Sequence, residues 1–414
     1  MPIILIAVLA AALPAVYLAA TVDPRGNLSG MPVALVVQEQ QSTGGGYADA
    51  VGDAVAASLG DAVTLLRMTS AELDSAMAED RVAGAIVIPD TFDAGIMSLL
   101  PEGADPSVPT VRIATNAGDG GLSNGLVVST VTPVLAEISG ELGARITGTL
   151  TSEVTPEEST LLSEPFAIAS GPYAELPSPS GLGTSAFYYA LILVLLAFIG
   201  ASLVNPLVDT SLGVIPGEVG PLVSRAPYTS VSRVRTFLVK AAILTTASPV
   251  AATILLGLAA WLGVTAPDPF MLWLFSAAVI AAIGTSALAI FAALGSGLGS
   301  LVNTLFFVAL AMVSSGAIVP LEATPPFFQL VSWLAPFRHV VDGTRALLYF
   351  DGNMAAGLGE AWWSVLLGGV AGVALGVAVT SLYGRFRRFT RDPRPLAEPA
   401  AFDAVVAPPE GTAR

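Results

Sequence analysis

The chain has 414 residues, of which 54% are hydrophobic and only 12% are charged, and it contains no Cys. This small number of charged residues cannot cover the surface of a soluble globular protein of this length. The chain is therefore expected to lie in a membrane. The absence of Cys excludes disulfides and thiolate metal sites, and the formal net charge of −15 argues against nucleic acid as a partner.

The first segment, Pro2 to Ala20, is apolar throughout. A secretory signal would begin with a positively charged region and end at a small-x-small cleavage site, and neither pattern is evident here. We therefore interpret residues 1–20 as a retained transmembrane helix.

The following stretch, Thr21 to Gly183, carries 21 acidic residues against 5 Arg, so its net charge is −16 and about +1 remains for the rest of the chain. Short β-rich runs alternate with helical patterns in this stretch, which predicts a small α/β unit with a largely parallel sheet. The β-rich runs lie at 33–37, 63–67, 83–89 and 110–114, and the helical patterns at 47–59, 70–78 and 91–100.

The end of this stretch returns the chain to the membrane. A longer helical pattern at 123–150 is expected to lead back toward the bilayer. Residues 155–180 are rich in Pro, Ser and Glu and are expected to form an irregular linker. We assign residues 21–183 to an extracytoplasmic acidic α/β domain with a linker, inserted between membrane helices 1 and 2.

Five further apolar segments follow, each long enough to cross a bilayer. They are Thr184 to Pro206, Thr236 to Leu262, Phe270 to Leu294, Leu301 to Pro320 and Trp362 to Gly384. The chain is therefore predicted to be a polytopic α-helical membrane protein with six transmembrane helices, five of which form a domain at residues 184–384. Residues 385–414 are expected to be a disordered cytoplasmic tail.

The basic residues outside the acidic stretch predict the orientation of the chain. They cluster after the second and sixth spans, at Arg225, Arg233, Arg235, Lys240, Arg385, Arg387, Arg388, Arg391 and Arg394. The positive-inside rule then places both termini in the cytoplasm and the acidic domain outside. With Lys240 assigned to a cytoplasmic flank, the spans are interpreted as free of ionisable residues, which disfavours an ion-driven secondary transporter.

Catalytic signatures are missing from the sequence. Lys240 is the only lysine and does not end a Gly-rich turn, so no P-loop is present. A single His without Cys removes most zinc and catalytic-triad arrangements. We expect a chain that is not an enzyme and has no catalytic residues, cofactor or metal.

Two groups of residues nevertheless stand out. One is a possible cluster at the outer membrane surface, where a structural role is favoured over catalysis: Arg338, His339, Asp342 and Arg345. The other repeats a small-xxx-small spacing, which favours close helix packing: Gly368, Gly372 and Gly376. The spacing leaves open whether that packing lies within one chain or between two copies.

Four segments in a fixed order carry a family resemblance. They are Tyr17 to Asn27, Met31 to Gln38, Arg81 to Phe92, and the stretch that begins Ser314-Ser-Gly-Ala-Ile-Val-Pro-Leu-Glu and continues through Leu334 to Leu347. In these segments the chain resembles the ABC-2 type exporter permeases, and within them the YhgE/Pip (phage infection protein) branch. The last segment is similar to the part of those permeases that dips back toward the membrane between spans five and six.

This resemblance implies an export permease of the bacterial plasma membrane that works as a homodimer, surrounded by membrane lipid, with a separate ATPase docked on its cytoplasmic loops. The implied docking loop is Asp209 to Arg235, with Glu218 and Arg225 as candidate contacts, although a solvated loop explains these two residues equally well. The expected substrate is lipidic or amphiphilic. The alternative is a membrane-anchored envelope scaffold, secretion accessory or phage receptor that acts through the external domain.

Overall fold

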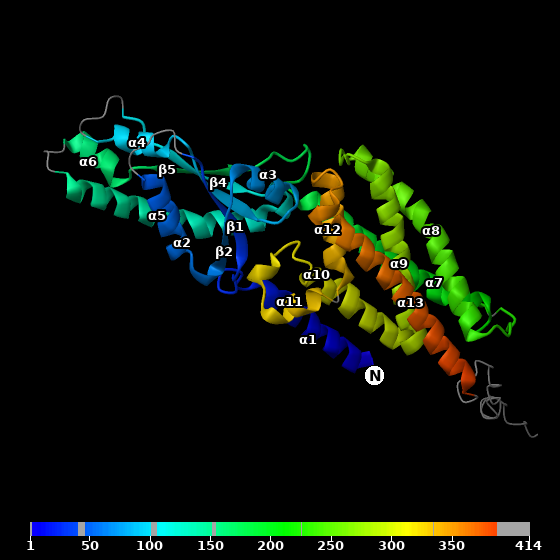
Figure 1. Cartoon of the computed structure of the whole chain (residues 1–414). Coiled ribbons are helices and arrows are strands. Elements are labelled where there is room, and N and C mark those ends of the chain that lie inside the picture. The colour runs from blue at the N-terminus through cyan, green and yellow to red at the C-terminus, as the bar shows by residue number, and fades with distance from the viewer. Residues whose placement is uncertain are drawn as a thin grey trace, which may run out of the picture.

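The computed structural model describes residues 2–39, 46–100, 106–150, 155–224, 226–333 and 335–386. The molecule consists of an α/β unit built around one sheet and a bundle of long apolar helices beside it (Figure 1). Nearly all of the expected cytoplasmic tail, from residue 387 onward, lies outside the described residues, as does Arg225.

The sheet of the α/β unit has five strands in the order β2-β1-β3-β4-β5. Neighbouring strands run parallel except for β3 and β4, where Ala85 pairs antiparallel with Ala114. The strands are β1 (Met31–Val37), β2 (Val63–Arg67), β3 (Gly84–Ile88), β4 (Thr110–Thr115) and β5 (Ala167–Pro172). The four predicted strands are confirmed. The prediction of an irregular linker at 155–180 is wrong, because this segment contains β5 and the helix α6 (Pro156–Ser163).

Helices cover both faces of this sheet. Alternate residues of β1 point to opposite sides, so Val33 and Leu35 belong to one buried cluster and Ala34 and Val36 to another. The first cluster is shared with α2 (Tyr47–Ser58), α4 (Phe92–Ser98) and α5 (Gly121–Thr149), and the second with α3 (Ser70–Ala78).

The helix α5 does not return the chain to the bundle as predicted. It buries a stripe of apolar residues at helical spacing in the core of the α/β unit, among them Val131, Leu135 and Ile138. It runs along the sheet away from the bundle, and β5 brings the chain back (Figure 1). The apolar stripe that suggested a route to the membrane instead packs on the sheet.

Six helical runs of the described chain are long and apolar enough to cross a membrane, which fits a polytopic membrane protein. They are Ile3–Thr21, Gly121–Thr149, Thr184–Ser211, Arg233–Trp261, Pro269–Val313 and Met354–Arg385. One of these runs, Gly121–Thr149, is α5 and belongs to the α/β unit. The other five contain the helices of the bundle, which are α1 (Pro2–Thr21), α7 (Thr184–Ser211), α8 (Arg233–Trp261), α9 (Pro269–Asn303) and α13 (Gly359–Arg385).

The longest run folds back on itself as two antiparallel legs. Gly295 has φ 76°, which breaks the helix and reverses the chain. Beyond it Gly299 lies against Phe291, and the Asn303 side-chain Nδ2 donates to the Ala287 carbonyl at 3.2 Å. The two legs correspond to the predicted fourth and fifth spans, but the helical part of the second leg ends at Val313 rather than at Pro320.

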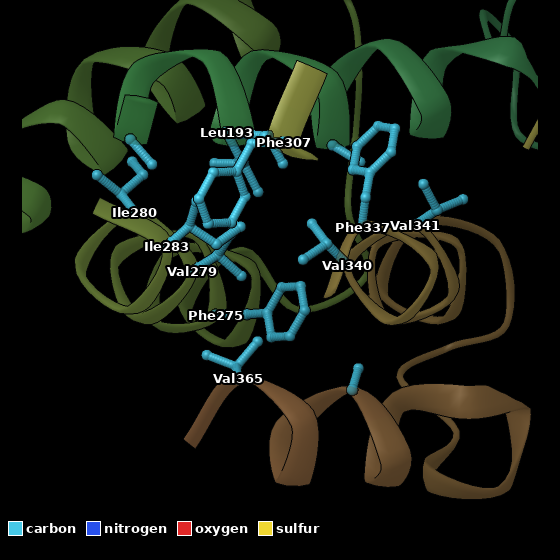
Figure 2. Packing of buried hydrophobic residues seen from close by; sticks show 14 of the residues in the cluster. Leu193, Phe275, Val279, Ile280, Ile283, Phe307, Phe337, Val340, Val341 and Val365 are labelled. Atoms are coloured by element: carbon cyan, nitrogen blue, oxygen red, sulfur yellow. The ribbon is translucent and has the colours of Figure 1, made fainter. Parts of the chain in front are cut away.

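The core of the bundle surrounds α9, which packs against α7, α8 and α13. A shorter helix, α12 (Pro336–Tyr349), joins this core from the loop between the fifth and sixth spans. Figure 2 shows Phe337 and Val340 of α12 facing Leu193 of α7 and Phe275 of α9. Burying these side chains fixes the position of α12 between the bundle and the α/β unit.

The assignment of Lys240 to a flank, outside the charge-free spans, is wrong. The helix α8 begins at Arg233, so Lys240 lies two turns inside it and only 5% of its surface is exposed. Its Nζ lies 2.8 Å from Asp209 Oδ1 of α7. The bundle therefore holds a buried ion pair near one end, contrary to the expectation of charge-free spans.

Candidate functional site

The polar face of α12 brings together three of the four residues of the predicted outer cluster. Arg338, Asp342 and Arg345 follow one another at helical spacing, so their side chains share the face opposite the apolar one. Arg338 Nε lies 3.7 Å from Asp342 Oδ2.

Arg345 joins this face to the α/β unit. Its Nη2 donates to the Asp119 carbonyl oxygen at 2.8 Å, and its Nη1 lies 3.8 Å from Asp119 Oδ1. Asp119 ends the short helix η2 (Ala117–Asp119), just after β4. Arg345 is only 7% exposed, so this ion pair is buried where α12 meets the α/β unit.

A cavity of about 300 Å³ lies at this junction and is unusually rich in charge. Its ionisable lining consists of six carboxylates and three guanidinium groups from both parts of the chain: Glu79, Asp80, Arg81, Asp119, Glu322, Arg338, Asp342, Arg345 and Glu360. Within the described ranges, no group of three His, Cys, Asp or Glu side chains is arranged to hold a metal ion. The three guanidinium groups line the same cavity as these carboxylates.

Burial raises the pKa of three of these carboxyl groups. It raises the pKa of Asp342 to about 7, against the opposing charges of Arg345 and Arg338. Burial, followed by the charge of neighbouring Asp80, raises the pKa of Asp119 well above its usual range, although Arg345 opposes the shift. Burial likewise raises the pKa of Asp80. Asp342 can therefore take up and release a proton near neutral pH.

The Asp342→Asn variant is expected to lose part of the pH dependence of stability. Folding raises the pKa of Asp342, so the folded protein binds this proton more tightly than the unfolded chain, and its contribution is largest at low pH. The contribution declines as pH rises from about 4 to about 7, by up to about 1.4 kcal/mol per pH unit. Thermal unfolding measured across this range should show a shallower decline for the variant. An unchanged slope would mean that Asp342 does not titrate there.

His339 lies apart from this group. His339 is not among the described residues that line the cavity. Its Nδ1 atom is buried and has no hydrogen-bond partner within the described part of the chain. Burial, followed by the charge of Arg338, lowers its pKa, so the imidazole is neutral near neutral pH.

Sequence reasoning missed the partners of the cluster. Asp80 and Asp119 lie more than 200 residues before Arg345. Asp80 adopts φ 54°, and Asn116 Nδ2 donates to its Oδ1 at 2.8 Å. Positive φ at a non-Gly residue was the only local signal, and it is not visible in a sequence.

The predicted docking loop contains a small hairpin at the opposite end of the bundle, formed by β6 (Gly217–Val219) and β7 (Leu222–Ser224) (Figure 1). Glu218 is exposed on β6. Leu222 and Val223 of β7 are exposed by 72% and 69%. Arg225, the other predicted contact, lies outside the described residues.

The three glycines of α13 differ in their surroundings. A Cβ on Gly372 would lie 2.8 Å from the Ser286 Cα of α9, and a Cβ on Gly376 would lie 2.0 Å from the Phe237 ring of α8. A Cβ on Gly368 would meet nothing within 4 Å. Gly372 and Gly376 therefore pack within one chain, whereas Gly368 has open space at its Cβ position and contacts α9 only through its carbonyl oxygen, which accepts from Ser286 Oγ at 3.2 Å.

Comparison with known proteins gives one match. The model of a family described as "ABC-2 family transporter protein" matches residues 1–380. No curated protein and no solved structure matches the chain.

Proposed function

Because the chain belongs to the ABC-2 transporter family, we propose that it is the permease subunit of an exporter that moves a lipidic or amphiphilic substrate across the bacterial plasma membrane. The observation that best supports this proposal is the bundle around α9. Its helices α7, α8 and α13 carry their described charged residues near their ends, so the middle of the bundle is apolar. A bundle with an apolar middle is suited to lie in a membrane and to form part of a transport path, and the energy for transport would come from another subunit.

The proposed orientation has both termini in the cytoplasm. The described basic residues Arg233, Arg235 and Arg385 lie at the end of the bundle that holds the β6–β7 hairpin, and the acidic α/β unit lies at the other (Figure 1). The positive-inside rule then makes residues 21–183 the extracytoplasmic domain, and residues 1–20 and 184–384 the membrane part. The finer assignment to the YhgE/Pip branch remains part of this proposal.

A separate ATPase is proposed to supply the energy by docking on the β6–β7 hairpin. Exposed apolar side chains outside the membrane favour contact with another protein, and Leu222 and Val223 provide them beside Glu218. We also propose a homodimer. The helix α1 has little contact with the rest of the chain and exposes Ile3, Ile4 and Ile6, which lipid or a second copy would cover.

Deletion and complementation in the native host test this function. Cells without the gene should retain an amphiphilic compound, or become more sensitive to one, and the wild-type gene should reverse the change. A Leu222→Asp/Val223→Asp variant should fail to complement, whereas Val108→Asp, which alters an exposed apolar residue of the α/β unit, should succeed. Unchanged export and sensitivity after deletion would contradict the permease function and favour the scaffold or receptor alternative.

A further inference from the structure

A second cavity lies where the α/β unit meets the bundle, beside the helix α3. Its volume is about 370 Å³, within the range of about 300–1,000 Å³ typical of small-molecule sites. The α/β unit lines it with residues of α3, of η2 and of the segment after β5, and the bundle with the end of α12 and the turn that follows. Asn353 of this turn donates from Nδ2 to the Ala78 carbonyl oxygen at 3.2 Å, which joins the two walls.

The ionisable lining of this cavity consists of carboxylates and tyrosines, and it includes no described Lys, Arg or His. The carboxylates are Asp74, Glu175 and Asp351, so the formal charge of the lining is −3. All three residues are exposed and therefore lie at the rim, where the cavity opens to solvent. None of them forms an ion pair with a described residue. The negative charge of the rim is therefore available to a ligand.

Two guanidinium groups act electrostatically on the lining tyrosines, but neither group lines the cavity. Arg112 donates from Nη2 to the Pro172 carbonyl oxygen at 2.6 Å, and Arg345 faces Asp119. A cation that enters the cavity would therefore meet carboxylates rather than a guanidinium group.

Aromatic side chains form the half-buried part of the lining. They are Tyr173, Tyr349 and Phe350. The faces of such rings attract cations that lie within about 6 Å of the ring centre. Apart from Asn116 and Asn353, the remaining lining residues are apolar. The cavity thus combines an acidic rim with aromatic and apolar walls.

Asn116 places an unused hydrogen-bond acceptor at the wall of this cavity. The residue is only 6% exposed, and its Nδ2 donates to Asp80 Oδ1 at 2.8 Å. Within the described part of the chain, no group donates to its Oδ1. Buried polar atoms normally have a hydrogen-bond partner. A ligand with an N–H donor would supply the one that this oxygen lacks.

We propose that this cavity binds an organic ammonium cation. The ammonium group would donate to Asn116 Oδ1, and the apolar body of the ligand would pack on the aromatic rings. The carboxylates of the rim would attract the cation and repel anions. This inference goes beyond the proposed function, because the cavity lies between the two parts of the chain and binding there requires no transport.

Isothermal titration of the purified full-length protein in an uncharged detergent tests the site. The probes are 2-phenylethylammonium, 2-phenylethanol as an uncharged molecule of similar shape, and the ammonium ion as a cation without an apolar body. The 2-phenylethylammonium should bind at least about tenfold more tightly than either of the others. Equal binding of 2-phenylethanol, or no binding of any probe, would overturn the proposal. Equal binding of the ammonium ion would overturn the role of the aromatic walls.

The triple variant Asp74→Asn/Glu175→Gln/Asp351→Asn removes the negative charge of the rim. The three side chains are exposed and the replacements keep their shape, so the variant should unfold near the wild-type temperature. It should bind 2-phenylethylammonium at least about tenfold more weakly than the wild type. Wild-type affinity in this variant would overturn the proposal.

A second triple variant controls for the overall charge of the α/β unit. Asp49→Asn/Asp61→Asn/Glu137→Gln removes the same amount of negative charge from exposed positions outside the cavity lining. This variant should bind 2-phenylethylammonium as the wild type does. An equal loss of affinity in both triple variants would show that the net charge of the unit attracts the cation, and would overturn the assigned site.

Two replacements of Tyr173 test the aromatic wall. Tyr173→Leu removes a ring and should weaken binding of 2-phenylethylammonium by about threefold or more, whereas Tyr173→Phe keeps the ring and should bind more tightly than Tyr173→Leu. Equal affinities of these two variants would overturn the role of this ring. The titrations need neither ATP nor an ATPase, so a failure of export in cells would contradict the proposed function without affecting the binding result.

Discussion

Replacing Arg345 with Ala is expected to destabilise the protein by about 3–5 kcal/mol, because it leaves buried carboxylates without their counter-charge. The guanidinium group contacts Asp119 through both its carbonyl and carboxyl oxygens, and its charge favours ionisation of Asp80 and Asp342 as well. Thermal unfolding in detergent measures the effect. The control Arg67→Ala breaks an ion pair that is largely exposed and should cost less than about 1 kcal/mol.

The cost of Arg345→Ala should depend on pH in a defined direction. Burial raises the pKa of Asp342 to about 7 in the folded protein, so at about pH 5 this carboxyl group holds its proton and needs little counter-charge. At about pH 8 Asp342 is mostly ionised, and the loss of the Arg345 charge should then cost more stability. An equal loss of stability at both pH values would show that Arg345 acts through packing alone.

Gly372→Ala is expected to cost about 1–3 kcal/mol by overpacking the contact between α13 and α9. Its Cβ would lie 2.8 Å from Ser286 Cα and 3.0 Å from Ser286 N, and backbone atoms cannot rotate away as a side chain can. Gly368→Ala is the matched control one turn earlier, where the added methyl group meets no atom within 4 Å.

The two glycine variants should differ in their effect on stability, and only Gly372→Ala should be destabilising. Ala is favoured over Gly in a helix interior by about 0.5–1 kcal/mol, so Gly368→Ala should be neutral or stabilising. Unfolding temperatures in the same detergent compare them directly. Equal effects would mean that α13 does not pack on α9 through Gly372. A loss at Gly368 alone would point to a contact with a second copy.

The elements that the sequence predicts well are those with a strong local pattern. The strand Val63–Arg67 and the helix Ser70–Ala78 have the predicted bounds, because an apolar β-rich run and a polar turn mark their edges. The strand Ala167–Pro172 escaped prediction because its residues are mostly exposed at the edge of the sheet, so no alternation of polar and apolar residues marks it.

The candidate site could be predicted only on its own helix. The spacing of Arg338, Asp342 and Arg345 was sufficient to group them, but Asp80 and Asp119 reach them only through the folding of the α/β unit against α12. Lys240 was misplaced because a basic residue near a helix end satisfies the positive-inside rule whether its side chain points to water or into the bundle. Local sequence patterns do not report such tertiary contacts.

The proposed coupling of this permease to a separate ATPase is tested most directly by purifying the tagged protein from its native membrane in mild detergent and determining the composition and mass of the particle. We expect a particle that contains two copies of this chain and a stoichiometric ATPase. The Leu222→Asp/Val223→Asp variant should lose the ATPase from this particle. Recovery of the intact wild-type protein without any ATPase, or with envelope proteins in its place, would contradict the proposed coupling.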